Sequence, residues 1–442
     1  MKHVAVIGSG ISGLASAHAL AARPQTRVTL FEAGDYFGGH THTVDITLPG
    51  PGGEAVTHGV DTGFLVFNHR TYPQLVKLFQ TLGVDTAASE MSFSVQAPGL
   101  EWSGCNLNTV FAQRSNLLKP RFLGMLADIL RFNKLCTGLA SRGQDAELAE
   151  PIGSFLDREA FGQRFRDGYF LPMIGCIWSC PTDQMLQFPV ATMIRFCHNH
   201  GLIQVADRPQ WHTVRGGAKH YVAKLLAGIP DARLNTPVRS LRRIEDGRAV
   251  MLATSLGEER FDHAVLACHS DQSLALLADA QPDERAVLGA VRYHPNRAVL
   301  HTDPSLLPRR RLAWAAWNYA RAAHVQREQA AVCLHYLINR LQPLPWEQPV
   351  VVSLNPDPSR PPDPARVLGA WEYSHPVFDR AAIDAQRRLP DIQARAGVSF
   401  CGAWTRYGFH EDGLMSAQDV VARLQQRWHG EDAANQPALA AA

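Results

Sequence analysis

The sequence predicts an α/β fold in which a Rossmann-like domain is interrupted by an inserted α+β substrate domain. Three observations support this. The chain has 442 residues, which is more than one ordinary core holds, so two domains are expected. A strand, a helix and a second strand follow one another within its first 31 residues. Segments of the same nucleotide-binding type return near residues 205–270 and at the end of the chain.

The first unit consists of an apolar strand at residues 3–7, a helix of small residues at 12–22 and a strand at 27–31. Apolar residues at helical spacing predict further helices at 72–82, 117–135, 152–165, 189–200, 219–226 and 415–426. Alternating or apolar runs predict strands at 233–241, 250–255, 264–267, 297–301, 331–337 and 398–401. The proline-rich stretch 342–364 has little periodicity and is expected to be irregular.

This order predicts a discontinuous cofactor domain. Its three parts are expected at residues 1–75, 206–275 and 396–430, and the substrate domain at 76–205 and 276–395. Residues 431–442 are small and polar and are expected to be a frayed tail.

Composition narrows the class of protein. Hydrophobic residues make up 46% of the chain and charged residues 19%, as in globular proteins. The net charge of +2 gives no reason to expect a nucleic-acid partner. The eight cysteines are scattered and suggest reduced thiols without a metal site. No apolar run reaches transmembrane length, so we expect a cytoplasmic protein.

The glycine-rich turn Gly8-Ser9-Gly10-Ile11-Ser12-Gly13 follows the first strand and opens the first helix. Gly8 permits the turn, Gly10 lets the backbone approach a diphosphate, and Gly13 allows the helix to pack closely on the strand. Glu32 ends the second strand about 20 residues further on, where a carboxylate accepts ribose hydroxyls. A dinucleotide site is therefore predicted here.

Four further segments extend the pattern: 32–43 with Gly38-Gly39-His40-Thr41, 214–221, 236–238 with 261–267, and 400–404 with 411–417. Together they resemble the superfamily of flavin-containing amine oxidases, protoporphyrinogen oxidases and phytoene desaturases. The resemblance implies a two-domain flavoprotein with non-covalent FAD. The cofactor-binding residues that it implies are Gly8, Gly10, Ile11, Ser12, Gly13, Glu32, Ala33, Gly38, Gly39, His40, Thr41, Val238, Gly402, Asp412, Gly413 and Leu414.

The chain departs from the superfamily at several positions. His40 stands where the superfamily has an arginine, and Ala403 where it has an acid. Two roles are open for the acidic residues that follow. Asp412 or Glu411 supplies the missing contact to the cofactor, or it caps the last helix. Many amine oxidases present a lysine to the flavin, but the matching stretch here carries Arg297, which cannot accept a proton in the same way. This weakens the expectation of amine oxidation.

Residues 177–181, 299–319 and 408–414 resemble more closely a bacterial group known as predicted NAD/FAD-binding oxidoreductases. Its members occur beside methyltransferases that resemble cyclopropane-fatty-acid synthase. The resemblance implies an FAD-dependent oxidoreductase of the dehydrogenase or desaturase type, with an unsaturated or methylated fatty acyl chain as substrate and a methyltransferase as pathway neighbour. The alternatives are an amine oxidase and a non-catalytic redox sensor that binds flavin.

Aromatic residues gather in the segments assigned to the site, as expected for a wall against an apolar substrate. The candidates for lining the substrate site are Trp178, Trp317, Tyr319, Trp404, Tyr407 and Phe409. His410 is the candidate catalytic base, and the alternative for it is a hydrogen-bonded structural histidine.

The helix expected at 117–135 has a broad apolar side flanked by lysines and arginines. It is either a membrane-surface helix, which would place the protein at the inner face of the membrane, or a lid packed on the substrate domain. Arg309-Arg310-Arg311 is either a solvated turn or an anchor for a carboxylate or phosphate head group.

Overall fold

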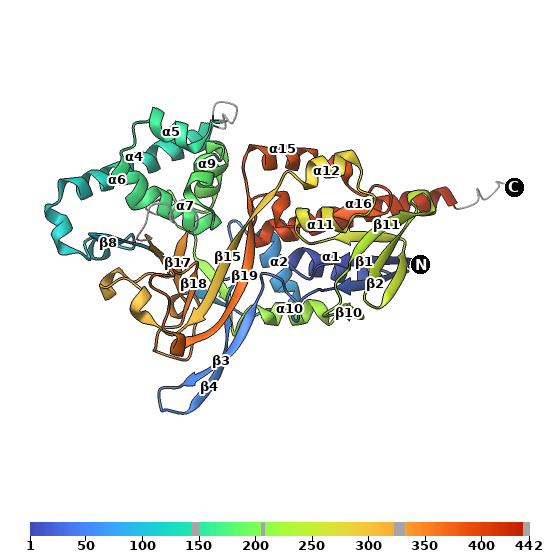
Figure 1. Cartoon of the computed structure of the whole chain (residues 1–442), viewed down its shortest axis with the longest axis horizontal. Coiled ribbons are helices and arrows are strands. Elements are labelled where there is room, and N and C mark those ends of the chain that lie inside the picture. Colours follow the sequence, from blue (N-terminus) through green and yellow to red (C-terminus); the bar gives the residue numbers. More distant parts are fainter. Residues whose placement is uncertain (143–147, 149, 205–207, 322–331, 436–442) are drawn as a thin grey trace.

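A computed structural model describes residues 1–142, 148, 150–204, 208–321 and 332–435 of the chain. It is elongated and has two lobes (Figure 1). One lobe contains both termini of the chain, and the other contains helices α4 to α9. The long strands β15 (Arg292–His301) and β19 (Val367–Val377) lie between the lobes.

The lobe that holds the termini is built on a five-stranded parallel sheet in the order β10-β2-β1-β14-β20. These strands are β1 (Lys2–Ile7), β2 (Thr26–Phe31), β10 (Asp231–Arg233), β14 (His263–Leu266) and β20 (Val398–Phe400). They come from three separate stretches of chain, each of which lies within one expected part of the cofactor domain. The domain limits themselves stay a prediction. Because the strands are parallel, their carboxyl ends meet at one edge, where such sheets bind ligands.

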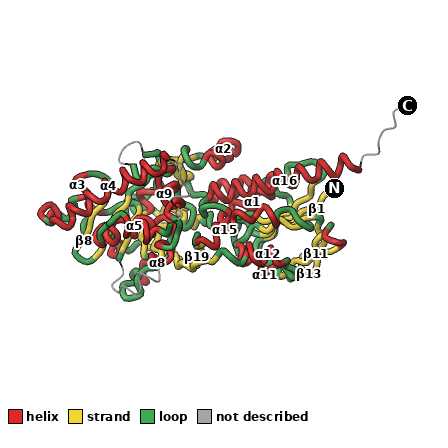
Figure 2. Tube along the Cα trace, turned by 90° about the horizontal axis from the view of Figure 1, so that it is seen from above, coloured by secondary structure: helices red, strands yellow, loops and turns green. Residues whose placement is uncertain are grey.

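Helices cover this sheet. α1 (Ile11–Ala21) buries Leu14, Ala17 and Leu20 against it, and α16 (His410–Asn435) packs beside α1 (Figure 2). The other helices of this lobe are α10 (Lys219–Leu226), α11 (Ser270–Leu276), α12 (Pro282–Leu288) and α15 (Arg380–Arg388). A separate antiparallel sheet consists of β11 (Ser240–Ile244), β12 (Ala249–Thr254) and β13 (Gly257–Phe261).

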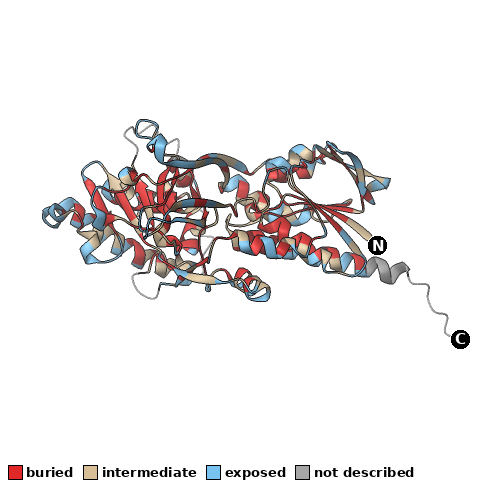
Figure 3. Ribbon diagram, turned by 90° about the horizontal axis from the view of Figure 1, so that it is seen from below, coloured by how far each residue is buried: buried red, intermediate tan, exposed pale blue. Residues whose placement is uncertain are grey.

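The second lobe is built on a seven-stranded sheet in the order β19-β15-β18-β17-β16-β7-β8. Its shorter strands are β18 (Val351–Leu354), β17 (Cys333–Leu337), β16 (Trp317–Ala320), β7 (Phe93–Ala97) and β8 (Leu100–Ser103). The helices on this lobe are α3 (Leu107–Val110), α4 (Pro120–Arg142), α5 (Ile152–Arg158), α6 (Gln163–Phe165), α7 (Leu171–Trp178), α8 (Thr182–Leu186) and α9 (Val190–Asn199). Buried residues lie on the strands of this sheet and on the helices of the lobe (Figure 3).

Smaller elements complete the chain. A hairpin of β3 (Thr43–Pro49) and β4 (Ala55–Asp61) projects from the side of the molecule (Figure 1). β5 (Phe67–Asn68), β9 (Trp211–Val214) and β6 (Thr86–Ser89) form a three-stranded sheet. The remaining helices are α2 (Pro73–Leu82) and α14 (Ile338–Leu341).

Most expected elements are present, but five details differ from the expectations. The helix expected at 152–165 is broken, because Ala160 has a left-handed backbone (φ 52°), and separates into α5 and α6. The strand expected at 233–241 is interrupted, because Asn235 is also left-handed (φ 51°) and Pro237 cannot donate to a ladder. β18 lies inside the stretch 342–364 that was expected to be irregular, and β19 was not expected.

The fifth difference concerns the end of the chain. α16 begins five residues before the expected helix and continues to Asn435, so residues 431–435 of the expected frayed tail have helical backbone. The rest of that tail lies outside the described residues. No helix in the part of the chain that the structure describes is long and apolar enough to cross a membrane.

Candidate functional site

The glycine-rich turn lies at the carboxyl edge of the parallel sheet, at the start of α1. A Cβ atom on Gly13 would lie 1.8 Å from the carbonyl oxygen of Gly8, so this glycine is required for the turn to fold. A Cβ on Gly10 would meet no protein atom within 4 Å, although Gly10 is the N-cap of α1 and lines a cavity. The space in front of Gly10 is therefore open to a ligand.

The first turn of α1 is suited to an anion. It contains no acidic side chain, and no side chain caps its amide groups. These amides and the positive end of the helix dipole favour a phosphate group. Ile11 and Ser12 line the cavity at this point. The open space beside these backbone amides is where a diphosphate would bind.

Glu32 is held at the end of β2 by the same turn. Its Oε2 accepts hydrogen bonds from Ser9 N (2.9 Å) and Ser9 Oγ (2.5 Å), and its Oε1 accepts one from Gly34 N (2.8 Å). Gly38 N donates to Ser9 Oγ (3.1 Å). The carboxylate thus lies beside the glycine-rich turn with a fixed orientation.

The cavity edge brings together eleven of the residues assigned to the cofactor. They are Gly8, Gly10, Ile11, Ser12, Glu32, Ala33, Gly38, Gly39, His40, Val238 and Gly402. Sequence reasoning missed Cys268 and His269, which directly follow β14 and also line the cavity. The signal was available, because ligands bind beyond the carboxyl ends of such strands.

Five assigned residues do not line the cavity: Gly13, Thr41, Asp412, Gly413 and Leu414. Asp412 accepts a hydrogen bond from Phe409 N (2.9 Å) and caps the start of α16. Glu411 accepts hydrogen bonds from Gln74 N (2.8 Å) and Leu75 N (2.9 Å) and caps α2. Of the two alternatives for this acidic pair, the structure therefore favours helix capping.

Gly413 and Leu414 have packing roles. A Cβ on Gly413 would lie 2.8 Å from Ile11 Cγ2 and 2.9 Å from Ser12 Oγ, so this glycine lets α16 approach the start of α1. Leu414 is buried in the core. Both residues support the end of the cavity that the cofactor-binding residues line, but neither of them lines it.

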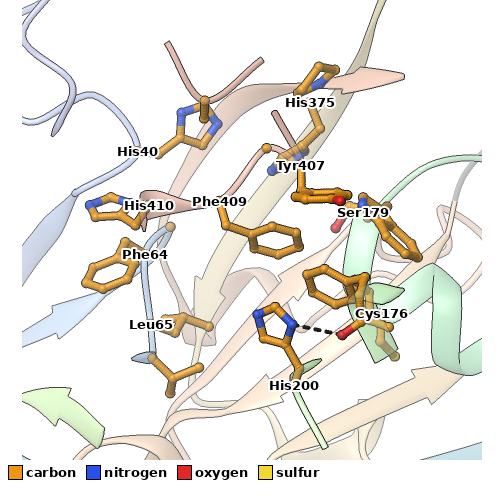
Figure 4. Close-up of a pocket in the computed structure, with 18 of the residues that line it drawn as sticks. His40, Phe64, Leu65, Cys176, Ser179, His200, His375, Tyr407, Phe409 and His410 are labelled. Atoms are coloured by element: carbon orange, nitrogen blue, oxygen red, sulfur yellow. Dashed lines mark hydrogen bonds between the residues drawn. The ribbon is translucent and has the colours of Figure 1, made fainter. Parts of the chain in front are cut away.

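His410 lies in the cavity wall, with its ring stacked on Phe64 at 3.7 Å between ring centroids (Figure 4). Its Nε2 is 2.7 Å from Tyr221 Oη and 3.0 Å from Thr41 Oγ1. Burial lowers the pKa of His410 to about 3. A neutral imidazole whose Nε2 is engaged by two hydroxyls fits the structural alternative better than that of a catalytic base.

A group of buried imidazoles lies near this wall. The ring of His40 is 5.3 Å from that of His375 and 6.3 Å from that of His269. Burial lowers the pKa of His40 and of His269 to about 4, and that of His375 to about 3. Burial therefore disfavours the charged form of all three imidazoles.

The tautomer of His375 is fixed by its neighbours. Asn296 Nδ2 donates to His375 Nδ1 (2.8 Å), and Asn296 Oδ1 accepts from Asn355 Nδ2 (2.7 Å). The proton of His375 therefore resides on Nε2. His375 lies on β19 and lines the cavity (Figure 4), and sequence reasoning missed it.

Beyond these imidazoles the cavity continues into the second lobe as far as α4. Its volume is about 1640 Å³, whereas pockets for one small ligand have about 300–1,000 Å³. The cavity therefore has room for a dinucleotide and a second molecule. Aliphatic and aromatic residues from several elements line its far half: Met91, Phe93, Trp102, Leu126, Ile129, Leu130, Met173, Ile177 and Phe196.

Five of the six aromatic candidates line the cavity. Trp178, Trp317, Tyr407 and Phe409 lie in its second-lobe half, and Phe409 stacks on Phe196 at 4.6 Å. Trp404 instead lies at the cofactor edge, where its Nε1 donates to Cys268 O (3.3 Å). Tyr319 was wrongly assigned: two residues beyond Trp317 along β16, it is buried in the main core and does not line the cavity.

The far half is lined mainly by apolar side chains. The charged side chains among the described residues that line it are Glu90, which pairs with Arg340 (2.6 Å), and Arg208. The indole nitrogens of Trp178 and Trp317 are buried without a hydrogen-bond partner. Arg297, which replaces the lysine of many amine oxidases, is exposed on β15 and does not line the cavity.

His200 is a titratable side chain beside the aromatic wall, with its ring stacked on Phe196 at 3.9 Å, and sequence reasoning missed it. Its Nδ1 donates to Phe196 O (2.9 Å), as Figure 4 shows, so its Nε2 is unprotonated. Its ring centroid is 6.0 Å from that of Phe409. Burial lowers the pKa of His200 to about 4, and the imidazole is a neutral proton acceptor at pH 7.

Comparisons with known proteins agree with this geometry. The family model for flavin containing amine oxidoreductases matches residues 11–300. A search of curated proteins with this sequence found no match.

Several solved structures have the same fold. Cyclohexylamine oxidase from Brevibacterium oxydans IH-35A is 16% identical, with a TM-score of 0.68 over 97% of this chain and 99% of its own. The CLA-producing fatty acid isomerase from P. acnes is 16% identical, with a TM-score of 0.67 over 96% and 98%. A putative protoporphyrinogen oxidase from Exiguobacterium sp. 255-15 is 17% identical, with a TM-score of 0.67 over 96% and 99%.

Proposed function

This chain belongs to the family of flavin containing amine oxidoreductases, and on that premise we propose that it dehydrogenates an apolar chain, such as an unsaturated or methylated fatty acyl group. The family makes it an FAD-dependent oxidoreductase. The substrate class rests on one observation: an apolar cavity continues from the cofactor edge to α4.

The described residues fit FAD. The amides at the start of α1 would hold the diphosphate and Glu32 the ribose. Gly38, Gly39 and Gly402 line the same part of the cavity. Bound FAD supplies a two-electron acceptor. The protein's own part is to position the substrate, exclude water and accept the proton that is released.

The walls of the far half favour a neutral, flexible substrate. Burying an acyl chain stabilises binding by about 0.8 kcal/mol per CH₂, so aliphatic and aromatic walls suffice to hold it. The unpaired indole N–H groups of Trp178 and Trp317 suit an acceptor oxygen on the substrate, since an unpaired buried donor costs about 1–3 kcal/mol. A carboxylate or ester of a fatty acyl group carries such an oxygen.

Forming a C=C bond removes a hydride and a proton from adjacent carbons. We assign the proton to His200, because its Nε2 is the unprotonated nitrogen and its ring lies beside Phe409. FAD held by the amides of α1 and by Glu32 would supply the acceptor for the hydride equivalent, with oxygen or another molecule as the final electron acceptor. This division of roles requires no charged side chain in the apolar half of the cavity.

An amine oxidase is the main alternative, because one structural neighbour oxidises cyclohexylamine according to its name. The described cavity offers little to an ammonium ion, since Glu90 is paired with Arg340. The name of another neighbour, the fatty acid isomerase, says that a protein of this fold acts on a fatty acid. A redox sensor without turnover is the remaining alternative.

Anaerobic mixing with candidate substrates tests the proposal. Purified holoprotein should lose its flavin absorbance with unsaturated or methylated fatty acids or phospholipids, and the product should be two mass units lighter. A product of unchanged mass with a shifted double bond would indicate isomerisation instead. Loss of absorbance with amines alone would favour the amine oxidase, and no loss with either class would favour the sensor.

A further inference from the structure

Exposed leucines gather at the end of the molecule that lies opposite the chain termini. Large apolar side chains are commonly buried, and a contiguous exposed group marks an interaction site. Six of the ten exposed large apolar residues in the described part of the chain lie here: Leu107 (79% exposed), Leu117 (50%), Leu118 (88%), Leu123 (44%), Leu130 (60%) and Leu312 (38%). Figure 2 places α3 and α4 together at this end.

Basic residues outnumber acidic residues around these leucines. Residues 102–127 and 304–314, which hold five of the six leucines, contain no Asp or Glu, and Asp128, beside Leu130, pairs with Arg131 (3.0 Å). The two segments contribute the exposed or half-exposed cations Arg114, Lys119, Arg121, Arg309 and Arg311. The turn that contains Arg311 and Leu312 packs on α3, so both segments belong to one surface. We call these six leucines and five cations the docking face.

The docking face is continuous with the cavity. Leu107 on α3 and Leu130 on α4 are exposed, and both also line the cavity. Leu126 and Ile129, which lie between the leucines of α4, line it as well. The far end of the cavity therefore lies directly beneath the exposed leucines.

We propose that the docking face binds the surface of an anionic lipid bilayer. Exposed leucines insert into the boundary between head groups and acyl chains, and cations around them attract anionic lipids. A second copy of the chain is a poorer occupant, because a two-fold interface would place the same cations against each other. That a substrate chain enters the cavity from this face rests on the proposed function, whereas binding to the bilayer does not.

Sedimentation with vesicles tests the docking face without turnover. The full-length holoprotein should sediment with vesicles that contain phosphatidylglycerol. Each cation near the surface contributes about 1 kcal/mol, so binding to vesicles of phosphatidylcholine alone should be at least about tenfold weaker. Leu118→Asp should weaken binding to the anionic vesicles about tenfold, because it removes one inserted side chain.

Matched controls lie on the opposite lobe. Leu256 is 74% exposed in the turn between β12 and β13, and Leu256→Asp should leave vesicle binding unchanged. Arg121→Glu should weaken binding, whereas Arg423→Glu on α16 should not. Equal vesicle binding by Leu118→Asp and Leu256→Asp would overturn the proposal. So would an unaltered protein that does not bind vesicles but forms a dimer in solution, if Leu118→Asp dissociates that dimer.

The result is separable from the enzymatic proposal. A fatty acid dispersed in detergent reaches the cavity without a bilayer, so Leu118→Asp should still lose its flavin absorbance with that substrate. Retained vesicle binding without reaction would contradict the proposed function alone. Reaction in detergent without vesicle binding would contradict the docking face alone.

Discussion

Replacing Gly10 by alanine separates cofactor binding from folding. The added Cβ meets no protein atom within 4 Å, and the apoprotein should lose little stability at this N-cap position, a few tenths to about 1 kcal/mol. The same atom occupies the open space where the diphosphate would contact the amides of α1. Displacing the diphosphate should weaken one or two of its hydrogen bonds to these amides, each of which contributes about 1.5–3 kcal/mol. The dissociation constant for FAD should therefore rise at least about tenfold.

Two other glycines provide controls for Gly10→Ala. A Cβ on Gly138 of α4 also meets no protein atom, so Gly138→Ala should leave FAD affinity unchanged and stabilise the helix by about 1 kcal/mol. A Cβ on Gly13 would lie 1.8 Å from Gly8 O, so Gly13→Ala should impair folding itself.

The assay titrates deflavinated protein with FAD while following flavin fluorescence, and it measures thermal unfolding of the apoprotein in parallel. Gly10→Ala should show reduced affinity with a nearly unchanged apoprotein Tm. Unchanged affinity would refute the assignment of the diphosphate to this turn. Reduced affinity that merely accompanies a large loss of apoprotein stability would refute the claim that the space in front of Gly10 belongs to a ligand.

Four further changes probe the cavity and its surroundings. Leu126→Trp should raise KM severalfold for long acyl chains but not for short ones. Leu123→Trp, on the exposed side of α4, should raise KM for neither kind of chain, and equal effects of the two variants on KM would place the acyl chain elsewhere. His200→Phe should lower kcat more than KM in steady-state assays, and an unchanged kcat would remove His200 as the proton acceptor. Trp317→Phe should raise KM for fatty acids but not for a hydrocarbon alkene, because only a fatty acid offers an oxygen to the indole N–H. An equal rise in KM for both substrates would mean that Trp317 contributes only packing. Burial raises the pKa of Asp412 to about 7, so the native state binds more protons than the unfolded state, and the free energy of unfolding should fall as pH rises from about 4 to 7. Asp412→Asn should flatten this part of the plot of unfolding free energy against pH, and an unaltered plot would contradict the raised pKa.

The cofactor half of the site was predictable because its constraints are local. Gly13 is required by an atom five residues earlier, and Glu32 follows from the length of one β-α-β unit. Such short-range relations leave a pattern in the sequence. Asp412 could not be placed in the same way, because a carboxylate that caps a helix and one that faces a cofactor occur in the same sequence pattern.

The substrate half depends on contacts between distant segments. His375 lies opposite His294 in the pairing of β19 with β15, and β19 itself escaped prediction because it contains Gly369 and Pro376, which are unfavourable in strands. Likewise, Trp317 and Tyr319 lie on one strand and share its alternation, but only Trp317 reaches the cavity. Distinguishing them requires knowing where the cavity ends, which no local pattern encodes.

The buried imidazoles bear on the proposed preference for a neutral substrate. His40, His375 and His410 have pKa values lowered by burial to about 4, 3 and 3, and His200 to about 4. Each therefore provides hydrogen-bonding atoms without a charge at neutral pH. An ammonium substrate would lose its hydration in such a cavity, where the carboxylate of Glu90 is already paired with Arg340, and that loss is costly. A neutral acyl chain incurs no such penalty, and a weakly basic imidazole suffices to accept a proton from a carbon that has already lost its hydride.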